Sequence, residues 1–177
     1  MAFTAYPAAG ETLTAAKLQS LIGEVRPVTA TKTADESLTS NTTLQNDDHL
    51  SVAFASTLTY VIAGELYVDG PTAGDINLRL TWTGTVTRLD WNVTGLATTA
   101  TAAEGDMKSV AQLGATTSPA TAITIGTITA NFSTIKLGGL LIPSTAGVLT
   151  LQWAQSVSTG TATTIRLGSW LKLIPSA

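Results

Sequence analysis

The C-terminal part of the chain constrains the fold most, because three of its segments alternate apolar and other residues with a period of two. These segments are residues 132–142, 148–156 and 163–174. This period places successive side chains on opposite faces of a β-strand. In the last segment one face is expected to hold four aliphatic residues, Ile165, Leu167, Leu171 and Leu173. Such a face must pack on a second layer, and the earlier segments are expected to supply it.

Composition narrows the classes of protein further. Of the 177 residues, 44% are apolar and only 12% are charged. No run approaches the roughly 18 apolar residues of a transmembrane helix, so no membrane is expected as a partner. Low charge with much apolar surface suits a chain that buries area against copies of itself. The net charge of −3 and the lack of a Lys/Arg cluster argue against nucleic-acid binding.

The N-terminal residues 1–26 differ from the rest and are predicted to form a separate arm, with Pro27 at the boundary. Residues 14–22 predict a short helix whose apolar stripe contains Leu18, Leu21 and Ile22. Phe3 and Tyr6 precede it. The helix could lie on its own β-domain, or the arm could grip a neighbouring protein. The start of the chain has neither the basic nor the apolar region of a signal peptide, so secretion by that route is not expected.

Residues 27–177 predict eight to ten short strands separated by Gly, Pro, Asn and Asp, which is typical of a β-sandwich or barrel. Residues 76–83 and 88–93 predict a hairpin around Thr83-Gly84, and residues 36–44 and 50–55 predict strands separated by a polar turn at 46–48. Residues 95–105 predict a loop, and residues 107–113 fit either a strand or one or two helical turns, of which a strand is favoured. One segment is apolar on both faces, at Leu137, Leu140, Leu141 and Ile142. This pattern fits a sandwich whose outer side is also covered, as in a trimer.

The residues that could carry chemistry do not form a recognisable set, so no enzyme activity, cofactor or metal is predicted. The chain has no cysteine, which excludes disulfides, thiolate catalysis and cysteine-based zinc sites. The single histidine, His49, follows Asp47 and Asp48 and could bind a metal, but a solvated turn is the expected setting. Carboxylates such as Asp69 and Asp75 flank a Gly-rich turn without matching a calcium loop.

The four tryptophans divide into two groups. Three of them, Trp82, Trp91 and Trp153, are in register with aliphatic neighbours and are expected in the core. Trp170 lies opposite the aliphatic set of its strand, so it is the best candidate for an interface or a ligand contact. Leu140 and Ile142 are the other candidates for a trimer interface.

Two parts of the chain resemble proteins of tailed bacteriophages. Residues 10–21, from Gly10-Glu11-Thr12-Leu13 to Leu21, resemble the N-terminal segment of small virion proteins of these phages, especially those that infect actinobacteria. Residues 32–40, 44–50, 60–66 and 73–76 are similar to a β-domain from the same setting. This domain occurs in capsid decoration, head-fibre and minor tail proteins.

The resemblance implies an all-β, jelly-roll or tumour-necrosis-factor-like sandwich that trimerises. It implies a homotrimeric decoration (cement) protein, made in the host cytoplasm, that binds the major capsid protein on the capsid surface. The arm would supply the capsid contacts through Phe3, Tyr6, Leu18, Leu21 and Ile22. The alternative is a head-fibre or minor tail protein that binds a host cell-surface glycan through Trp170 or loop 95–105. A hydrolase is a third hypothesis.

Overall fold

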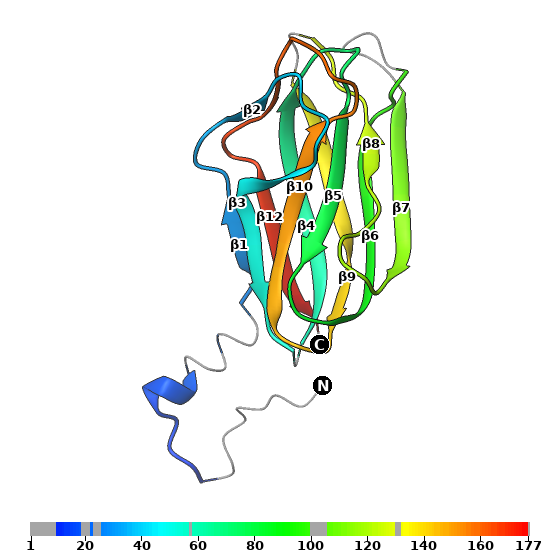
Figure 1. Ribbon diagram of the computed structural model, residues 1–177. Coiled ribbons are helices and arrows are strands. Elements are labelled where there is room, and N and C mark those ends of the chain that lie inside the picture. The colour runs from blue at the N-terminus through cyan, green and yellow to red at the C-terminus, as the bar shows by residue number, and fades with distance from the viewer. Residues whose placement is uncertain are drawn as a thin grey trace.

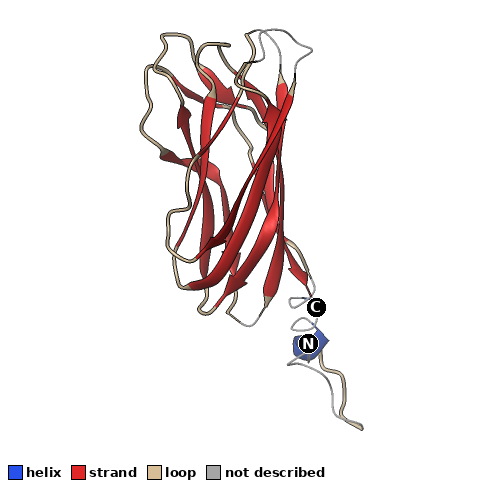
Figure 2. Cartoon of the chain, turned by 90° about the vertical axis from the view of Figure 1, so that its right-hand side faces the viewer, coloured by secondary structure: helices blue, strands red, loops and turns tan. Residues whose placement is uncertain are grey.

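A computed structural model describes residues 10–18, 22, 26–56, 58–99, 106–129 and 132–176. The strands of this part of the chain form two antiparallel sheets that pack face to face (Figures 1 and 2). The larger sheet has the order β1 (Val28–Thr31), β12 (Trp170–Ser176), β4 (Thr59–Asp69), β9 (Ser133–Pro143), β6 (Val86–Leu96) and β7 (Met107–Ala115). Two short strands, β2 (Glu36–Leu38) and β11 (Thr163–Ile165), also belong to it. The smaller sheet has the order β3 (Gln45–Phe54), β10 (Gly147–Gln155), β5 (Ile76–Trp82) and β8 (Ile123–Ile125).

The strand order is that of a jelly roll. Eight main strands follow the chain as β1, β3, β4, β5, β8, β9, β10 and β12. The larger sheet takes the first, eighth, third and sixth of these, and the smaller sheet takes the second, seventh, fourth and fifth. Two interlocked Greek keys produce this order. The remaining long strands, β6 and β7, pair as a hairpin inserted between β5 and β8, and they extend the larger sheet beyond β9. The predicted all-β jelly-roll sandwich is therefore confirmed.

The core lies between the sheets and follows from the period of two. In β5 every second residue from Ile76 to Trp82 is buried. Trp91 and Trp153 are among the largest fully buried side chains, and Trp82 is 7% exposed. The prediction that these three tryptophans are core residues is confirmed. Removal of such apolar area from water is the main stabilising contribution to a sandwich of this kind.

The predicted hairpin between β5 and β6 is wrong. β5 pairs with β10 and β8, whereas β6 pairs with β9 and β7. The Thr83-Gly84 turn therefore carries the chain from one sheet to the other. Both strands have one apolar face, and this property fits any inner surface of a sandwich without specifying the partner strand.

Four further assignments differ from the predictions. Residues 46–48 are part of β3 instead of a turn, and the predicted strand 36–44 ends at Leu38. The predicted strand 163–174 is interrupted between β11 and β12, so Leu167 is 62% exposed and does not join the buried face of Ile165, Leu171 and Leu173. Gly95, assigned to a loop, extends β6, while the predicted strand at 107–113 is confirmed as β7.

Candidate functional site

Two strand interruptions lie side by side, and charged side chains gather around them. β1 ends at Thr31 and the chain resumes as β2, while the chain between β11 and β12 leaves the sheet at residues 166–169. The two interruptions are joined by the backbone, because the Lys32 N–H donates to the Ser169 carbonyl at 2.8 Å and the Gly168 N–H donates to the Lys32 carbonyl at 2.9 Å. Gly168 has φ +84°, a left-handed conformation that favours glycine. This pairing places Lys32 inside the protein and Arg166 toward solvent.

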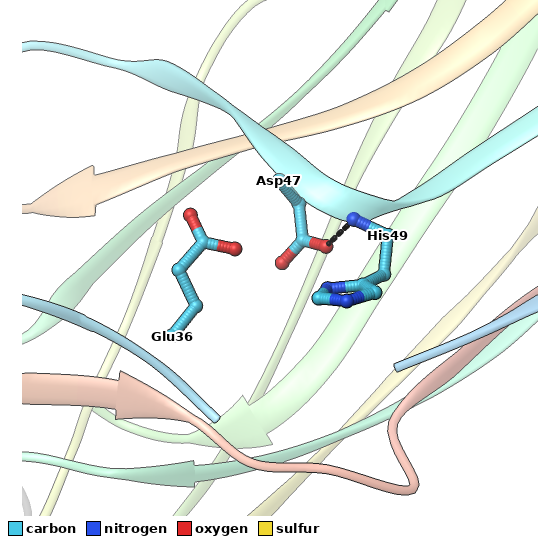
Figure 3. A group of neighbouring side chains, drawn as sticks. All are labelled: Glu36, Asp47 and His49. Atoms are coloured by element: carbon cyan, nitrogen blue, oxygen red, sulfur yellow. Dashed lines mark hydrogen bonds between the residues drawn. The ribbon is translucent and has the colours of Figure 1, made fainter. Parts of the chain in front are cut away.

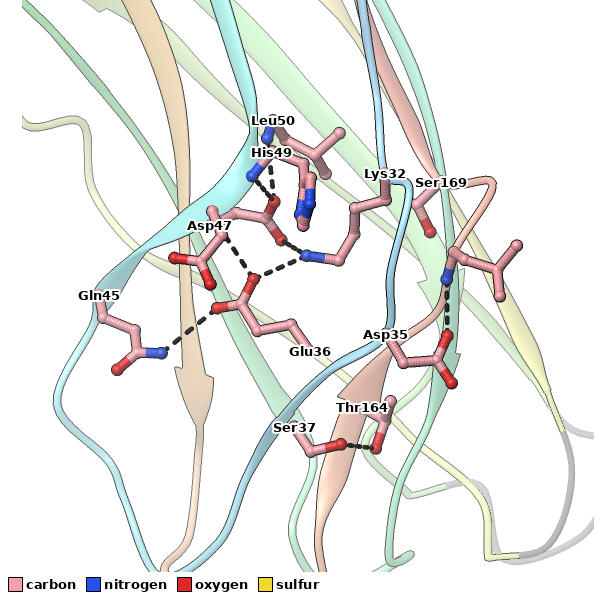
Figure 4. Close-up of polar contacts among 12 residues, drawn as sticks. Lys32, Asp35, Glu36, Ser37, Gln45, Asp47, His49, Leu50, Thr164 and Ser169 are labelled. Atoms are coloured by element: carbon pink, nitrogen blue, oxygen red, sulfur yellow. Dashed lines mark hydrogen bonds and ion pairs between the residues drawn. The ribbon is translucent and has the colours of Figure 1, made fainter.

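Lys32 is the centre of a buried charged cluster (Figure 4). Its Nζ lies 2.6 Å from Glu36 Oε2 and 2.7 Å from Asp47 Oδ2, and the side chains of Lys32 and Asp47 are fully buried. Glu36 is on β2 of the larger sheet, whereas Asp47 is on β3 of the smaller one. The ammonium group therefore ties the two sheets together at their β1–β3 edge. A buried ammonium is tolerated only when it is paired in this way.

Further hydrogen bonds fix both carboxylates. Asp47 Oδ1 accepts the backbone N–H groups of His49 and Leu50, each at 2.9 Å. Glu36 Oε2 also accepts the Asp48 N–H at 3.1 Å, and Glu36 Oε1 accepts the Gln45 side-chain amide at 3.3 Å. Burial alone would raise the pKa of Glu36, but the hydrogen bonds from Lys32 and Asp48 outweigh burial and hold this pKa below its usual value. Glu36 is accordingly a carboxylate at neutral pH.

Glu36, Asp47 and His49 also form the one group of potential metal ligands among the described residues (Figure 3). Their ligand atoms lie within 4.8 Å of one another, and His49 Nδ1 is buried without a hydrogen-bond partner. However, the Lys32 ammonium already contacts both carboxylates, so a divalent cation would have to displace a buried positive charge. The arrangement thus favours an internal ion cluster over a metal site. The expectation that His49 lies on a solvated turn is wrong, because His49 is a half-buried residue of β3.

A second polar cluster, on the solvent side, surrounds Arg166. Its guanidinium binds Asp35 Oδ2 and Asp69 Oδ2, each at 2.7 Å, and lies 5.3 Å from the centre of the Phe132 ring. The Leu167 N–H donates to Asp35 Oδ1 at 2.8 Å. This hydrogen bond makes the largest contribution to holding the pKa of Asp35 below its usual value, and the bond from Arg166 also lowers this pKa.

These groups border an open hollow of about 390 Å³, the Arg166 hollow, lined by Asp35, Tyr67, Phe132, Arg166 and Leu167. Phe132 and Leu167 are 69% and 62% exposed. The hollow therefore combines apolar and charged groups at the surface. This hollow was not predicted from the sequence, because its lining residues come from four separate segments of the chain.

The predicted interface residues Trp170, Leu140 and Ile142 all lie on the outer face of the larger sheet. Strand register places Val61 of β4 opposite Leu140 on one side and Ile174 on the other. Leu140, Ile142 and Ile174 are half-buried, and Val61 is 41% exposed. We call these four residues the outer apolar patch. Trp170 is farther along the same face, where the Lys172 ammonium lies 5.0 Å from its ring. Their role as an interface remains a prediction.

The described part of the N-terminal segment contains a helical turn at residues 15–18, with residue 22 also helical. Thr14 caps it, since its hydroxyl oxygen accepts the Lys17 N–H at 3.2 Å. Leu18 and Ile22 are 46% and 48% exposed. Figure 1 shows this turn away from the sandwich, near the end where the C-terminus lies. Phe3, Tyr6 and Leu21, the other proposed anchors, lie outside the described residues. No described helix is long and apolar enough to cross a membrane.

Comparison with known proteins adds little beyond these observations. No protein-family model matches the chain, and no curated protein matches it. Among solved structures, the VP2 subviral particle of infectious bursal disease virus is 19% identical with a TM-score of 0.23, over 85% of this chain and 42% of that chain. The Gt strain of the same virus gives 18% identity and a TM-score of 0.22, over 85% of this chain and 41% of that chain. The chain thus spans about two fifths of the length of these proteins, and TM-scores this low carry no argument about function.

Proposed function

We propose that this protein is a structural component of a tailed-phage virion, a homotrimeric decoration protein that binds and stabilises the lattice of the major capsid protein. The observation that carries the proposal is the pair of apolar surfaces that the described chain leaves without a partner. One is the outer apolar patch on the larger sheet, and the other is the exposed helical turn with Leu18 and Ile22. The resemblance of residues 10–21 and of the β-domain to phage virion proteins supports the same function.

The outer apolar patch suits contact between copies of the sandwich. Its four side chains are contiguous by strand register, and the neighbouring positions Ala63 and Gly138 are small, so another surface can approach the sheet closely. Full burial of one large aliphatic side chain is worth about 1.5–3 kcal/mol. The patch can thus make a substantial contribution to association, although it needs a wider surrounding interface to form a stable trimer.

The N-terminal arm suits a different partner. Its helical turn is too short to be stable on its own and gains stability only by docking. In this proposal the arm of each protomer lies on the major capsid protein, so that one trimer makes three linked contacts with the shell. Linked contacts raise the overall affinity far above that of a single arm, and binding stabilises the shell by mass action.

The first experiment measures the mass of the purified protein in solution and its co-sedimentation with capsids that lack it. A trimer that binds shells at high copy number is expected. Deletion of residues 1–26 should leave folded trimers that no longer bind shells. Equal binding by the truncated protein would refute the role of the arm, and a trimer that ignores shells would refute decoration.

A matched pair of variants tests the outer apolar patch. Leu140→Glu places a charge in the patch and should yield monomers. Thr134→Glu changes an exposed residue on the same outward face of β9 and should leave the trimer intact. If both variants remain trimeric, a different surface forms the trimer.

The Arg166 hollow supports a second candidate function, that of a head-fibre or minor tail protein that binds host cell-surface glycan. An exposed aromatic ring such as that of Phe132, beside fixed charged groups, is suited to stacking on a sugar ring and bonding its hydroxyls. Selective binding on a glycan array, lost in Phe132→Ala, would favour this function. A decoration protein should show no selective glycan binding.

A further inference from the structure

The Lys32 cluster brings an amine and two carboxylates together in a site where only the Glu36 side chain, which is 10% exposed, reaches solvent. Lys32 Nζ contacts Asp47 Oδ2 at 2.7 Å and Glu36 Oε2 at 2.6 Å, and the side chains of Lys32 and Asp47 have no exposed surface. An ion pair explains these distances. The same three groups could also form an amide bond, with Lys32 and Asp47 as the reactants and Glu36 as the group that carries the protons. We propose that Lys32 and Asp47 join through an intramolecular isopeptide bond, with Glu36 as the catalytic residue.

The position of the amine favours the reaction. Groups held in contact by a folded protein react as if at a very high local concentration, with effective molarities of about 10⁵–10⁸ M in well-oriented cases. Lys32 is held at both ends, because its backbone bonds to Ser169 and Gly168 while its Nζ bonds to the two carboxylates.

The electrophile is equally well placed. Attack by Nζ on Asp47 Cγ places negative charge on one carboxyl oxygen. Asp47 Oδ1 already accepts two backbone N–H bonds at 2.9 Å, from His49 and Leu50 (Figure 4). Two fixed donors aimed at the oxygen that gains charge have the arrangement of an oxyanion hole. Oδ2, which faces the amine, is the oxygen that leaves.

Glu36 completes the proton transfers. Its ionised carboxylate takes a proton from the Lys32 ammonium and passes it to Asp47 Oδ2, so that a neutral amine attacks Cγ of a carboxylic acid. Glu36 then carries a second proton from the same nitrogen to Oδ2, which departs as water. A C–N bond forms, a C–O bond breaks, and Glu36 ends as it began. The ammonium and carboxylate become a neutral amide plus one water, with no oxidant or other reactant.

The bond would have a clear structural effect. It would covalently join the end of β1 in the larger sheet to β3 in the smaller one, at an edge that is otherwise held by non-covalent contacts. Such a bond closes the loop between residues 32 and 47 in the unfolded chain and thus lowers the entropy gained on unfolding. This inference rests on the cluster alone and does not depend on the proposed virion function.

Intact mass spectrometry of the denatured full-length protein tests the proposal. The native sequence should be lighter than its calculated mass by one water, about 18 Da. Proteolytic digestion should give a branched peptide that joins the segments containing Lys32 and Asp47. Glu36→Gln retains an oxygen that accepts the Lys32 and Asp48 hydrogen bonds but cannot carry protons, so it should fold and show the full mass.

Two lysine variants serve as a matched pair. Lys32→Arg should show the full mass because arginine cannot form this amide, whereas Lys172→Arg on the outer face of β12 should still lose one water. The proposal is overturned if the folded native protein shows the full calculated mass, which would leave the cluster as an ion pair. It is also overturned if the mass loss persists in Lys32→Arg, which would assign the dehydration to another residue.

Discussion

Substitution of Lys32 by methionine should lower the free energy of unfolding, because it removes the single positive charge of the buried cluster. The change keeps an apolar stem of similar length in a fully buried position but leaves two carboxylates without a counter-charge. Oxygens of Glu36 and Asp47 lie within 4.8 Å of each other. At an effective dielectric constant of about 20, two unit charges at that separation repel by about 3.5 kcal/mol. Measured costs of breaking a buried ion pair are similar, about 3–5 kcal/mol.

The informative comparison is with the triple variant Lys32→Met/Glu36→Gln/Asp47→Asn. Asparagine at the last position keeps an oxygen for the N–H bonds of His49 and Leu50, so the triple variant removes charge while it preserves these contacts. Neither variant has the Lys32 amine, so a covalent bond cannot contribute to the difference. The triple variant should be more stable than Lys32→Met by about 3 kcal/mol at pH 7.

Urea unfolding followed by tryptophan fluorescence measures this difference, since Trp91 and Trp153 are buried. Lowering the pH toward about 4 protonates the unpaired carboxylates of the single variant, so the gap between the two variants should close. Equal stability of the two variants at pH 7 would refute the reasoning, because it would mean that water reaches the carboxylates and screens their repulsion.

Three further predictions follow from other parts of the structure. A Cβ at Gly147 would lie 2.1 Å from the Thr83 carbonyl oxygen, so Gly147→Ala should cost about 2–3 kcal/mol in thermal unfolding, whereas Gly160→Ala, which meets nothing within 4 Å, should be neutral. Burial raises the pKa of Asp75 above 3.8 despite the Thr127 N–H bond, so the stability linked to its protonated form is lost as pH rises through that pKa. Asp75→Asn should therefore be more stable than the native protein at pH 7 in urea unfolding, and this advantage should disappear as the pH falls through the pKa of Asp75. Arg166→Ala should raise the pKa of Asp35 in an NMR titration, because only the Leu167 N–H bond then remains to lower it; an unchanged pKa would contradict this assignment.

The buried charged cluster could not be predicted from the order of residues along the chain. Lys32 gave no signal in the sequence, because a single lysine among threonines and alanines is normally solvated. Asp47 and His49 were considered, but as part of an exposed turn. Only the pairing of the two strand interruptions buries Lys32 and directs it toward β3, and that pairing joins residues more than 130 positions apart in the chain, such as Lys32 and Ser169.

Several of the long strands, the class of fold and most of the core could be predicted from the sequence alone. Alternation of apolar residues is a local property, and it correctly identified β5, β9 and β10 as strands and three tryptophans as buried. The tertiary structure alone decided which strands pair, where the strand ending in Ile174 is interrupted, and which charged groups are buried. The physical reason is that an apolar face only requires some partner surface, whereas the choice of partner and the burial of a charge depend on contacts between distant segments.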